Sequence, residues 1–569
     1  MIKADLEKQI STILQDLGVE EASVSLSYPP KGMGHYSSNA AMMYAKKLGQ
    51  SPMQLAEQIV EKLKNETKDM NMQVVKPGFI NFSLSSSELG SILPTILEQK
   101  NQYGTSSLLS GQKVMIEFTD PNPFKEFHIG HLYSNIVGES ISRLYESQGA
   151  TVWRACYQGD VGMHVAKALW GLQTLMNEQQ KNIDEISELT LPEKSKLLGE
   201  AYALGASRFE ENEEIKKEIA VLNKKIYTED PEIMTLYVLG RAWSLDYFET
   251  IYTRLGTAFK KYYLESQVAK VGLEFVKEYL AKGIFKESNG AVIFPGEEYG
   301  LHTRVFINSL GLPTYEAKDL GLAPAKYNDF PYDTSIIITA NEVNTYFQVI
   351  LKVLSLIKPE LAKKTTHLSH GLVKLPQGKM SSRSGNILTG EWLLNTAHTL
   401  ATEKMDTPDD ETAEKIAQAA VKYALLKSDI GRDIEFNFEE SINFHGHSGP
   451  YLQYTFVRCQ SIENKGGEKA ISGAASVDYT QWTDEERMIL WLLRKYQEIL
   501  PVATNNHSPS LVCTYLFDLA QEFNGYYQKH TVLHENTEVR HVRLQLTAAV
   551  KQTLENGLYL LGIKTVSSM

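Results

Sequence analysis

The stretch VMIEFTDPNPFKEFHIGHLYSNIVG, residues 114–138, contains the change from strand to helix that decides the fold. Its first five residues alternate as a strand does, and a helical pattern follows the two histidines, His128 and His131. The run ATVWRACY at 150–157 is predicted to be the next strand. A strand, a helix and a second strand in this order predict an α/β domain on a parallel sheet.

The length and composition predict a protein of several domains. The chain has 569 residues, of which 43% are hydrophobic, and this is enough to bury a sizeable core. The first twenty residues mix charged and apolar positions at helical spacing, so we expect no signal peptide. No run approaches the ~18 apolar residues of a membrane span, so no membrane partner is expected.

The cysteines and the net charge narrow the class of protein further. Cys156, Cys459 and Cys513 are far apart, which predicts neither a disulfide framework nor a zinc knuckle, and favours a reducing, cytoplasmic setting. The net charge of −12 opposes nonspecific attraction to nucleic acid. A polyanionic partner would therefore need a local binding patch.

The pattern along the chain predicts three parts. Residues 1–105 read as an α+β domain. Residues 106–390 read as the α/β domain, with a charged, helical insertion at about 165–300 that includes EENEEIKKEIAVLNKKIY. Strand signals almost vanish from about 391 to 569, which predicts an all-α bundle.

The histidine pair has the chemistry of an anion site. A helix that begins near His128 has free backbone N–H groups, to which the histidines add donors and Lys125 adds a charge. Gly130 would let a flat ring or a ribose approach the backbone. Two histidines on a helix surface are an equally good interpretation of these four residues, whereas a metal site is disfavoured because no third acidic or thiol ligand is nearby.

A second stretch, KMSSRSGN at 379–386, puts cations and hydroxyls on a glycine-bounded loop suited to closing over phosphates. Alone it is a solvated basic turn. Together with the His-Ile-Gly-His run, it resembles the two signatures of class I aminoacyl-tRNA synthetases. PTYEAKDLGLA, SGPYLQYTFVRCQSI and PGFINF extend the resemblance over nearly the whole chain, to the arginyl-tRNA synthetase family in particular.

The resemblance implies an architecture and a reaction. The architecture is a Rossmann-like parallel-sheet catalytic domain with a helical insertion, an N-terminal α+β tRNA-binding domain and a C-terminal all-α anticodon-binding bundle. The reaction joins L-arginine to tRNA(Arg), through an arginyl-adenylate made from ATP with Mg²⁺. Such chemistry needs orientation and charge stabilisation rather than a protein nucleophile.

Four residues match the positions that hold arginine in that family: Glu117, Asn122, Tyr315 and Asp319. A guanidinium is planar and permanently charged, so paired carboxylates can form forked hydrogen bonds that lysine or citrulline would not reproduce. For Asp319, a helix N-cap ahead of LGLA is the alternative.

The resemblance also implies the nucleotide site. It carries ATP binding over to His128, Gly130, His131, Lys379, Met380 and Ser381, and catalytic roles to Lys125, His128, His131 and Lys379. One departure concerns Ser382, which stands where the generic signature has its second lysine. We expect Lys125 to supply the replacement charge.

Two further departures are visible. His164 stands where the family usually has glutamine, and Glu342 or Val343 stands near another expected glutamine. The arginine contact at that second position stays unassigned.

The resemblance assigns tRNA contacts to Phe79, Asn81, Tyr451, Tyr454, Tyr527 and Met569. Tyrosines suit stacking on unpaired bases, although tyrosines that pack a helical core are the alternative. A buried strand that turns at Gly78 is the alternative for the first two residues. His445 and His447 have metal-like spacing, but phosphate contact or a plain turn is favoured.

Three rivals compete with this prediction: another class I synthetase, a nucleotidyltransferase that shares the histidine signature, and a noncatalytic tRNA-binding paralogue. The acidic pair Glu117 and Asp319, and the lack of a cysteine-rich insert, favour arginine. The long helical tail disfavours the nucleotidyltransferase. The retained signature residues disfavour the noncatalytic protein. We expect a monomer.

Overall fold

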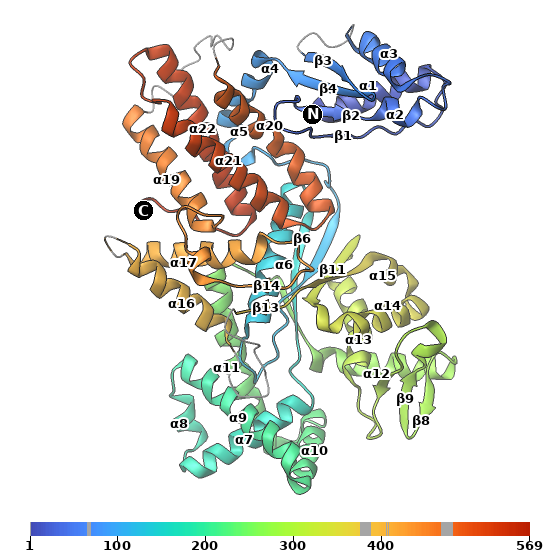
Figure 1. The fold of residues 1–569 in the computed structure, drawn as a ribbon. Coiled ribbons are helices and arrows are strands. Elements are labelled where there is room, and N and C mark those ends of the chain that lie inside the picture. The colour runs from blue at the N-terminus through green and yellow to red at the C-terminus, as the bar shows by residue number, and fades with distance from the viewer. Residues whose placement is uncertain (1, 65–69, 376–387, 406, 408, 468–481) are drawn as a thin grey trace. The chain divides into compact units, whose positions relative to one another are not determined.

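The computed structural model describes residues 2–64, 70–375, 388–405, 407, 409–467 and 482–569. The chain divides into two compact units. Their helices and strands are labelled in Figure 1. The first contains residues 106–453, 503–513 and 558–569, and the second contains residues 1–105, 454–502 and 514–557.

A five-stranded parallel sheet, in the order β12-β11-β5-β6-β7, organises the first unit. Its strands are β5 (Lys113–Glu117), β6 (Thr151–Gln158), β7 (Lys261–Leu264), β11 (Thr334–Ala340) and β12 (Thr365–His370). β5 lies between β6 and β11, so the strand order reverses direction at β5. Ligands of open α/β sheets bind beyond the carboxyl ends of the strands at such a point. The predicted parallel α/β domain is confirmed.

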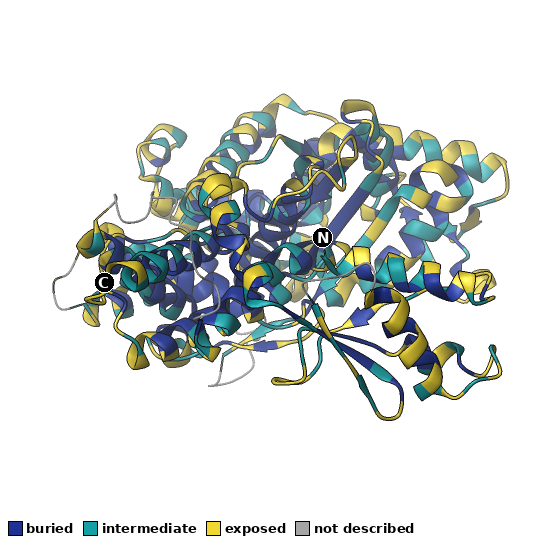
Figure 2. Cartoon of the chain, turned by 90° about the horizontal axis from the view of Figure 1, so that it is seen from above, coloured by how far each residue is buried: buried dark blue, intermediate teal, exposed yellow. Residues whose placement is uncertain are grey.

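Helices in the connections of this sheet bury their apolar residues. They are α6 (Ile129–Ser147), α12 (Glu265–Ala281), α13 (Tyr315–Asp329), α14 (Asn344–Ile357) and α15 (Pro359–Lys364). Helices in the structure commonly carry buried residues on one side and exposed residues on the other (Figure 2). α6 is an exception, because most of its residues are buried. Its Gly138 lies against Phe118, where a side chain would not fit.

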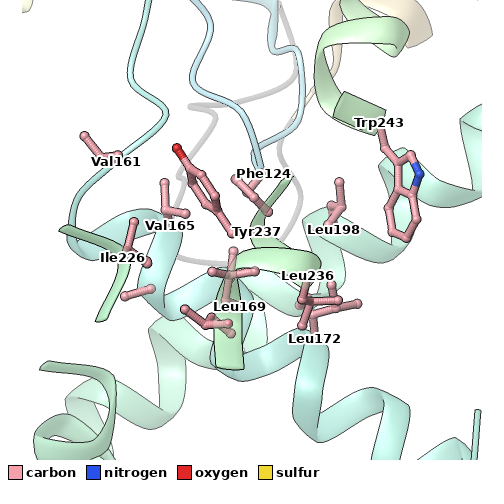
Figure 3. Packing of buried hydrophobic residues seen from close by; sticks show 14 of the residues in the cluster. Phe124, Val161, Val165, Leu169, Leu172, Leu198, Ile226, Leu236, Tyr237 and Trp243 are labelled. Atoms are coloured by element: carbon pink, nitrogen blue, oxygen red, sulfur yellow. The ribbon is translucent and has the colours of Figure 1, made fainter. Parts of the chain in front are cut away.

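A helical insertion follows β6. It consists of α7 (Met163–Gln179), α8 (Ile183–Ser187), α9 (Leu191–Glu211), α10 (Glu213–Tyr227) and α11 (Pro231–Leu255). These helices share an apolar core that also receives Phe124 from the loop after β5 (Figure 3). The Phe124 ring is stacked on Tyr237, with 6.2 Å between the ring centroids. The insertion core therefore fixes the loop that carries Asn122 and Lys125.

The expectation of a helical insertion up to about residue 300 is wrong beyond Leu255. β7 is an edge strand of the main sheet, and β8 (Lys286–Ser288), β9 (Ala291–Phe294) and β10 (Arg304–Ile307) form a small antiparallel sheet. Strands of three or four residues are too short to display a clear alternation, so charged neighbours conceal them in the sequence.

The remaining elements of the first unit are short strands, helices and 3₁₀ turns. They are η2 (Gly296–Tyr299), η3 (Asn341–Val343), β13 (Val373–Lys374), α16 (Gly390–Glu403), α17 (Asp410–Leu426), β14 (Ile434–Glu435) and α18 (Phe438–Ser441). β13 and β14 pair in parallel.

The second unit joins an antiparallel sheet to helices from the C-terminal part of the chain. The sheet has the order β1 (Leu26–Ser27), β2 (Tyr36–Ser38), β4 (Phe79–Leu84) and β3 (Met70–Val75). The helices are α1 (Ile2–Asp16), α2 (Ala40–Tyr44), α3 (Pro52–Lys64), α4 (Ser86–Gly90), α5 (Ile92–Gln99), η1 (Lys100–Gln102), most of α19 (Gly449–Gly466) and α20 (Asp484–Asn505), and α21 (Pro509–Lys529) and α22 (Thr537–Leu560) for the larger part of each.

Hydrogen bonds tie the two parts of this unit together. The Tyr36 hydroxyl donates to Glu498 Oε1 at 2.5 Å, and the Tyr103 hydroxyl donates to the backbone oxygen of Leu493 at 2.6 Å. The predicted α+β N-terminal part and helical C-terminal part are both confirmed. Among the described residues, no helix is long and apolar enough to cross a membrane.

Candidate active site

A pocket of about 440 Å³ opens at the carboxyl ends of β5, β6 and β11. Seven residues of the predicted arginine and nucleotide sites line it: Glu117, Asn122, His128, Gly130, His131, Tyr315 and Asp319. They come from β5, the loop after it, the start of α6 and the start of α13. The fold thus brings the predicted arginine residues and the predicted nucleotide histidines to one site.

The two histidines fix each other at the start of α6. His128 is the N-cap, and its Nδ1 accepts hydrogen bonds from the backbone N–H groups of Gly130 and His131 at 3.1 and 3.4 Å. His131 Nδ1 accepts in return from the His128 backbone at 3.3 Å, and the rings stack with centroids 3.5 Å apart. Because both Nδ1 atoms accept, the ring hydrogen of each neutral histidine lies on Nε2.

The environment keeps both rings uncharged at neutral pH. Burial by surrounding protein atoms, and then the charge of Lys125, lower the pKa of His128 to about 4, although the residue lines the open pocket. Burial, followed by the neighbouring His128, also lowers the pKa of His131. The pair therefore offers neutral N–H donors to an anion rather than positive charge.

One expectation for this stretch is wrong. The backbone N–H groups of Gly130 and His131 are not free, because the His128 ring caps them. Gly130 lines the pocket, and a Cβ there would lie 3.0 Å from His128 Cε1, so the glycine also makes room for the capping histidine.

Lys125 lies near the histidines without lining the pocket. Its Nζ is 4.7 Å from the centroid of the Tyr202 ring on α9, a cation–π contact. Its charge nevertheless contributes to the lowered pKa of His128, His131 and His164. Lys125 is thus a nearby cation held by the insertion.

Glu117 is already paired inside the protein. Its Oε2 is 2.5 Å from Lys326 Nζ on α13, and both side chains are almost fully buried. The carboxylate is a main cause of the raised pKa of Lys326. One oxygen of Glu117 therefore fastens α13 to the end of β5, in addition to any contact that the residue makes in the pocket.

Asn122 is held against the end of β6. A side chain at Gly159 would collide with Asn122 Oδ1 and would lie 3.1 Å from Glu265 Oε1. A glycine at position 159 therefore lets the Asn122 amide lie close to the backbone while it lines the pocket.

Tyr315 is oriented by His164. His164 Nε2 is 2.7 Å from the backbone oxygen of Gly159, so this nitrogen carries the hydrogen and donates. Nδ1 then accepts from the Tyr315 hydroxyl at 3.1 Å. Burial lowers the pKa of His164 to about 3, so the ring stays neutral. The Tyr315 oxygen keeps lone pairs with which to accept a hydrogen bond from a ligand.

Asp319 lies one helical turn after Tyr315 on α13. The N-cap alternative is wrong, because Thr314 is the N-cap and Asp319 lies inside the helix. Its Oδ2 accepts a hydrogen bond from the Tyr346 hydroxyl at 2.6 Å. Burial, and then Glu117 and other carboxylates, raise its pKa to about 8. A cationic ligand would stabilise the ionised form.

Sequence reasoning missed several residues that line this pocket, including Asp120, Tyr157 and Arg304. Asp120 could have been predicted from the sequence, because it is an acidic residue two positions before Asn122. Tyr157 ends a predicted strand, and Arg304 comes from a strand that was not predicted. Both Glu342 and Val343 line the pocket, so the geometry does not choose between them.

The second signature, at 379–386, lies outside the described residues. It includes Lys379, Met380, Ser381 and Ser382. The described residues therefore carry the first signature. They also carry the carboxylates Glu117, Asp120 and Asp319 of the pocket, which we call the acidic floor.

The predicted tRNA residues of the second unit lie in different surroundings. Asn81 on β4 is buried, and its Oδ1 accepts from the Ser37 hydroxyl at 2.7 Å, while Phe79 is half-buried. Tyr454 on α19 and Tyr527 on α21 flank Arg458, whose guanidinium carbon is 4.8 and 4.9 Å from the two ring centroids. All three line a pocket of about 500 Å³.

The other predicted tRNA residues belong to the first unit. Tyr451 is in the first turn of α19 and is half-buried, and Met569 is exposed at the end of the chain. His447 packs edge-on against Tyr423, with 5.4 Å between the centroids. Within the described ranges, no group of three His, Cys, Asp or Glu residues is arranged to hold a metal.

Three family models match successive parts of the chain. The arginyl tRNA synthetase N terminal domain matches residues 1–84, the catalytic domain of tRNA synthetases class I (R) matches 92–438, and the DALR anticodon binding domain matches 452–569.

Known proteins match over almost the full length. Arginine–tRNA ligase of Clostridium perfringens is 30% identical and covers 97% of each chain, and that of Parabacteroides distasonis is 30% identical over 91% of each. The structure of Thermus thermophilus arginyl-tRNA synthetase has the same fold, with a TM-score of 0.81, 24% identity and all of both chains covered. The chain belongs to the arginyl-tRNA synthetase family of class I tRNA synthetases.

Proposed function

We propose that this arginine–tRNA ligase activates and transfers arginine with the residues of the pocket between β5, β6 and β11. The carboxylate of arginine attacks the α-phosphate of ATP, so pyrophosphate leaves and arginyl-adenylate remains. A hydroxyl of the terminal adenosine of tRNA(Arg) then takes the arginyl group and releases AMP. The observation that carries the proposal is one pocket that joins a capped, neutral histidine pair to an acidic floor.

The histidine pair binds the phosphates of ATP in this proposal. The Nε2–H groups of His128 and His131 donate to phosphate oxygens, and their neutral state lets them keep one geometry through the reaction. Gly130 holds the pair together, and Lys125 adds positive charge nearby. Lys379, Met380 and Ser381, which lie outside the described residues, complete the site in this proposal.

Mg²⁺ enters with ATP. The side chains that face the proposed phosphate position are nitrogen donors, whereas Mg²⁺ prefers oxygen ligands. Phosphate oxygens and water would therefore hold the ion, which neutralises charge on the phosphates. The histidines orient those phosphates directly.

The acidic floor binds arginine. Asp319 and Glu117 attract the guanidinium, the Tyr315 oxygen accepts a hydrogen bond from one of its N–H groups, and the Asn122 amide orients the amino acid. A neutral citrulline side chain carries no positive charge to stabilise the ionised form of Asp319, which gives a physical basis for selectivity.

The tRNA contacts follow the family match. Tyr454, Arg458 and Tyr527 form a polar and aromatic pocket whose ring faces suit unpaired bases of the anticodon loop. Tyr451 and Met569 add contacts to the same RNA, and Phe79 contacts it from the N-terminal domain. Asn81 contributes indirectly in this proposal, because its buried side chain accepts a hydrogen bond from Ser37 and its strand is paired on both sides. The enzyme works as a monomer in the cytoplasm in this proposal.

Exchange of labelled pyrophosphate into ATP tests the activation step. We expect exchange to depend on arginine, and we measure it with and without tRNA(Arg), since the family resemblance implies that tRNA takes part. Exchange supported by another amino acid, and absent with arginine, would contradict the proposal.

Lys125→Ala tests the role of the nearby cation in the same assay. We expect a higher KM for ATP and slower exchange, because the phosphates lose a positive neighbour. Lys167→Ala, on the insertion outside the pocket, is the control. Unchanged exchange in Lys125→Ala would remove this residue from the site.

A further inference from the structure

Asp120 is a carboxylate of the acidic floor to which the proposed function assigns no role. It follows β5, two positions before Asn122, and lines the same pocket as Glu117 and Asp319. Its position at the end of the central strand places it where ligands of an open parallel sheet bind.

The backbone holds Asp120 in an unfavourable conformation. Thr119 and Asp120 have φ angles of 81° and 45°, in the left-handed region that most non-glycine residues avoid. The turn is fastened to α6, because the Thr119 backbone N–H donates to Ser134 Oγ at 2.9 Å and Asn135 Nδ2 donates to Thr119 Oγ1 at 3.0 Å. Strain of this kind, held by neighbours, is typical of functional sites.

The same turn fixes the position of the Asp120 carboxylate. Asp120 Oδ1 accepts a hydrogen bond from the backbone N–H of Tyr157 on β6 at 2.7 Å. Among the described residues, Asp120 forms no ion pair. The side chain is therefore positioned by one oxygen, and its negative charge has no cation of its own.

The cationic side chains near the acidic floor are each paired with a carboxylate other than Asp120. Lys326 is paired with Glu117 and Lys318 with Glu265, each at 2.5 Å, and Arg304 lies 3.4 Å from Glu316. Glu117 and Asp319 face Asp120 with like charge, and Lys326 is the cation that partly offsets them. Burial and Glu117 raise the pKa of Asp120, so a cationic ligand would stabilise its ionised form.

A second polar group of the floor is also unsatisfied. The Tyr157 hydroxyl is buried and has no hydrogen-bond partner among the described residues, although Tyr157 lines the pocket. A buried hydroxyl without a partner is costly, and a bound polar ligand would remove that cost.

We propose that Asp120 binds the guanidinium group of the substrate arginine, as a specificity residue in addition to Glu117, Asn122, Tyr315 and Asp319. This inference rests on the proposed function. Asp120 and Asp319 flank the guanidinium, each accepting charge-assisted hydrogen bonds from its N–H groups. One oxygen of Glu117 is paired with Lys326, and Asp120 adds a further ionic contact to the guanidinium.

Asp120→Asn is the direct test, because an asparagine oxygen can still accept from Tyr157 N–H while the charge is lost. We expect the KM for arginine in tRNA charging to rise roughly 10- to 100-fold, the loss typical of a hydrogen bond to a charged group. The KM for ATP should stay within about 2-fold, since the histidines are untouched. Glu126→Gln removes a carboxylate from the same loop outside the pocket, and its KM for arginine should not change.

Discrimination against citrulline separates binding from a merely structural role. Citrulline has the shape of arginine without the charge, so Asp120→Asn should lower the ratio of kcat/KM for arginine over citrulline by the same roughly 10- to 100-fold. Asp120→Ser, whose hydroxyl can also accept from Tyr157, is the second variant if the first fails to fold. An arginine KM within about 2-fold of wild type in either folded variant, or equal losses for arginine and ATP, would overturn the inference. Failure of the wild type to charge arginine would instead overturn the proposed function.

Discussion

Glu117 and Lys326 form an ion pair in which each buried charge depends on the other. We predict that Lys326→Met lowers the free energy of unfolding by about 3 to 5 kcal/mol, because it leaves the Glu117 carboxylate buried and unpaired. Urea denaturation measures the change. The double variant Glu117→Gln, Lys326→Met should recover part of the loss, whereas additive losses in the double variant would contradict a direct pair.

His164 should make the stability depend on pH. Its pKa is about 3 in the folded protein against an ordinary 6.5, so the unfolded chain binds a proton at a pH where the folded one does not. That proton stabilises the unfolded state, so the contribution is fully present above pH 6.5 and is lost as the pH falls towards 3. At pH 5 the loss is about 2 kcal/mol.

His164→Gln tests this prediction, because glutamine cannot take up the proton. Urea denaturation at pH 7 and pH 5 should show a smaller decrease in the free energy of unfolding for the variant than for wild type. Equal decreases in the two proteins would show that His164 does not contribute.

Helix α6 is capped by His128, and we propose that the same ring donates a hydrogen bond to the phosphates of ATP. We predict that His128→Ala lowers the free energy of unfolding by about 1 kcal/mol through loss of the cap, and lowers kcat about 10²- to 10³-fold through loss of the phosphate donor. His128→Asn separates the two effects, since asparagine is a good N-cap without an Nε2–H.

The asparagine variant should therefore keep the stability of wild type and lose activity as the alanine variant does. Thermal unfolding and arginine-dependent pyrophosphate exchange are the two measurements. Wild-type activity in His128→Asn would show that the cap alone is what the site needs.

The elements also show what the sequence could predict. β5 and β6 are long enough for a strand pattern to be recognised in the sequence, and α10 has a clear helical period. β7, β8 and β9 are three or four residues long and were missed, because so short a strand has no readable alternation.

The candidate site was predictable where chemistry and spacing agree, as for the His-Ile-Gly-His run. Contacts between residues far apart in the sequence were not predictable. The pairing of Glu117 with Lys326, 209 residues away, the hydrogen bond of His164 with Tyr315, and the exposure of Asp120 to the pocket depend on how β5, β6 and α13 meet.

In the molecule as a whole, the insertion is joined through Phe124 to the loop that carries Asn122. The ring is fully buried in the apolar core of the insertion and stacks on Tyr237 (Figure 3). We predict that Phe124→Ala lowers the free energy of unfolding by about 3 to 5 kcal/mol and also raises the KM for arginine, because the loop that carries Asn122 loses its anchor. Leu172→Ala, in the same core away from the loop, is the matched control.

The two variants should differ in kinetics although both lose stability. Steady-state charging at a temperature where both remain folded measures the KM for arginine. A similar KM in Phe124→Ala and Leu172→Ala would mean that the insertion stabilises the protein without positioning the loop.

We propose that the chain joins arginine, and no other amino acid, to tRNA with the residues of this pocket. Charging of total tRNA with each of the twenty labelled amino acids in turn tests it most directly, with ATP and Mg²⁺ present. We predict that arginine alone is incorporated, and that Asp319→Asn impairs arginine use far more than it raises the KM for ATP. Incorporation of a different amino acid, or no incorporation of arginine by the wild-type chain, would contradict the claim.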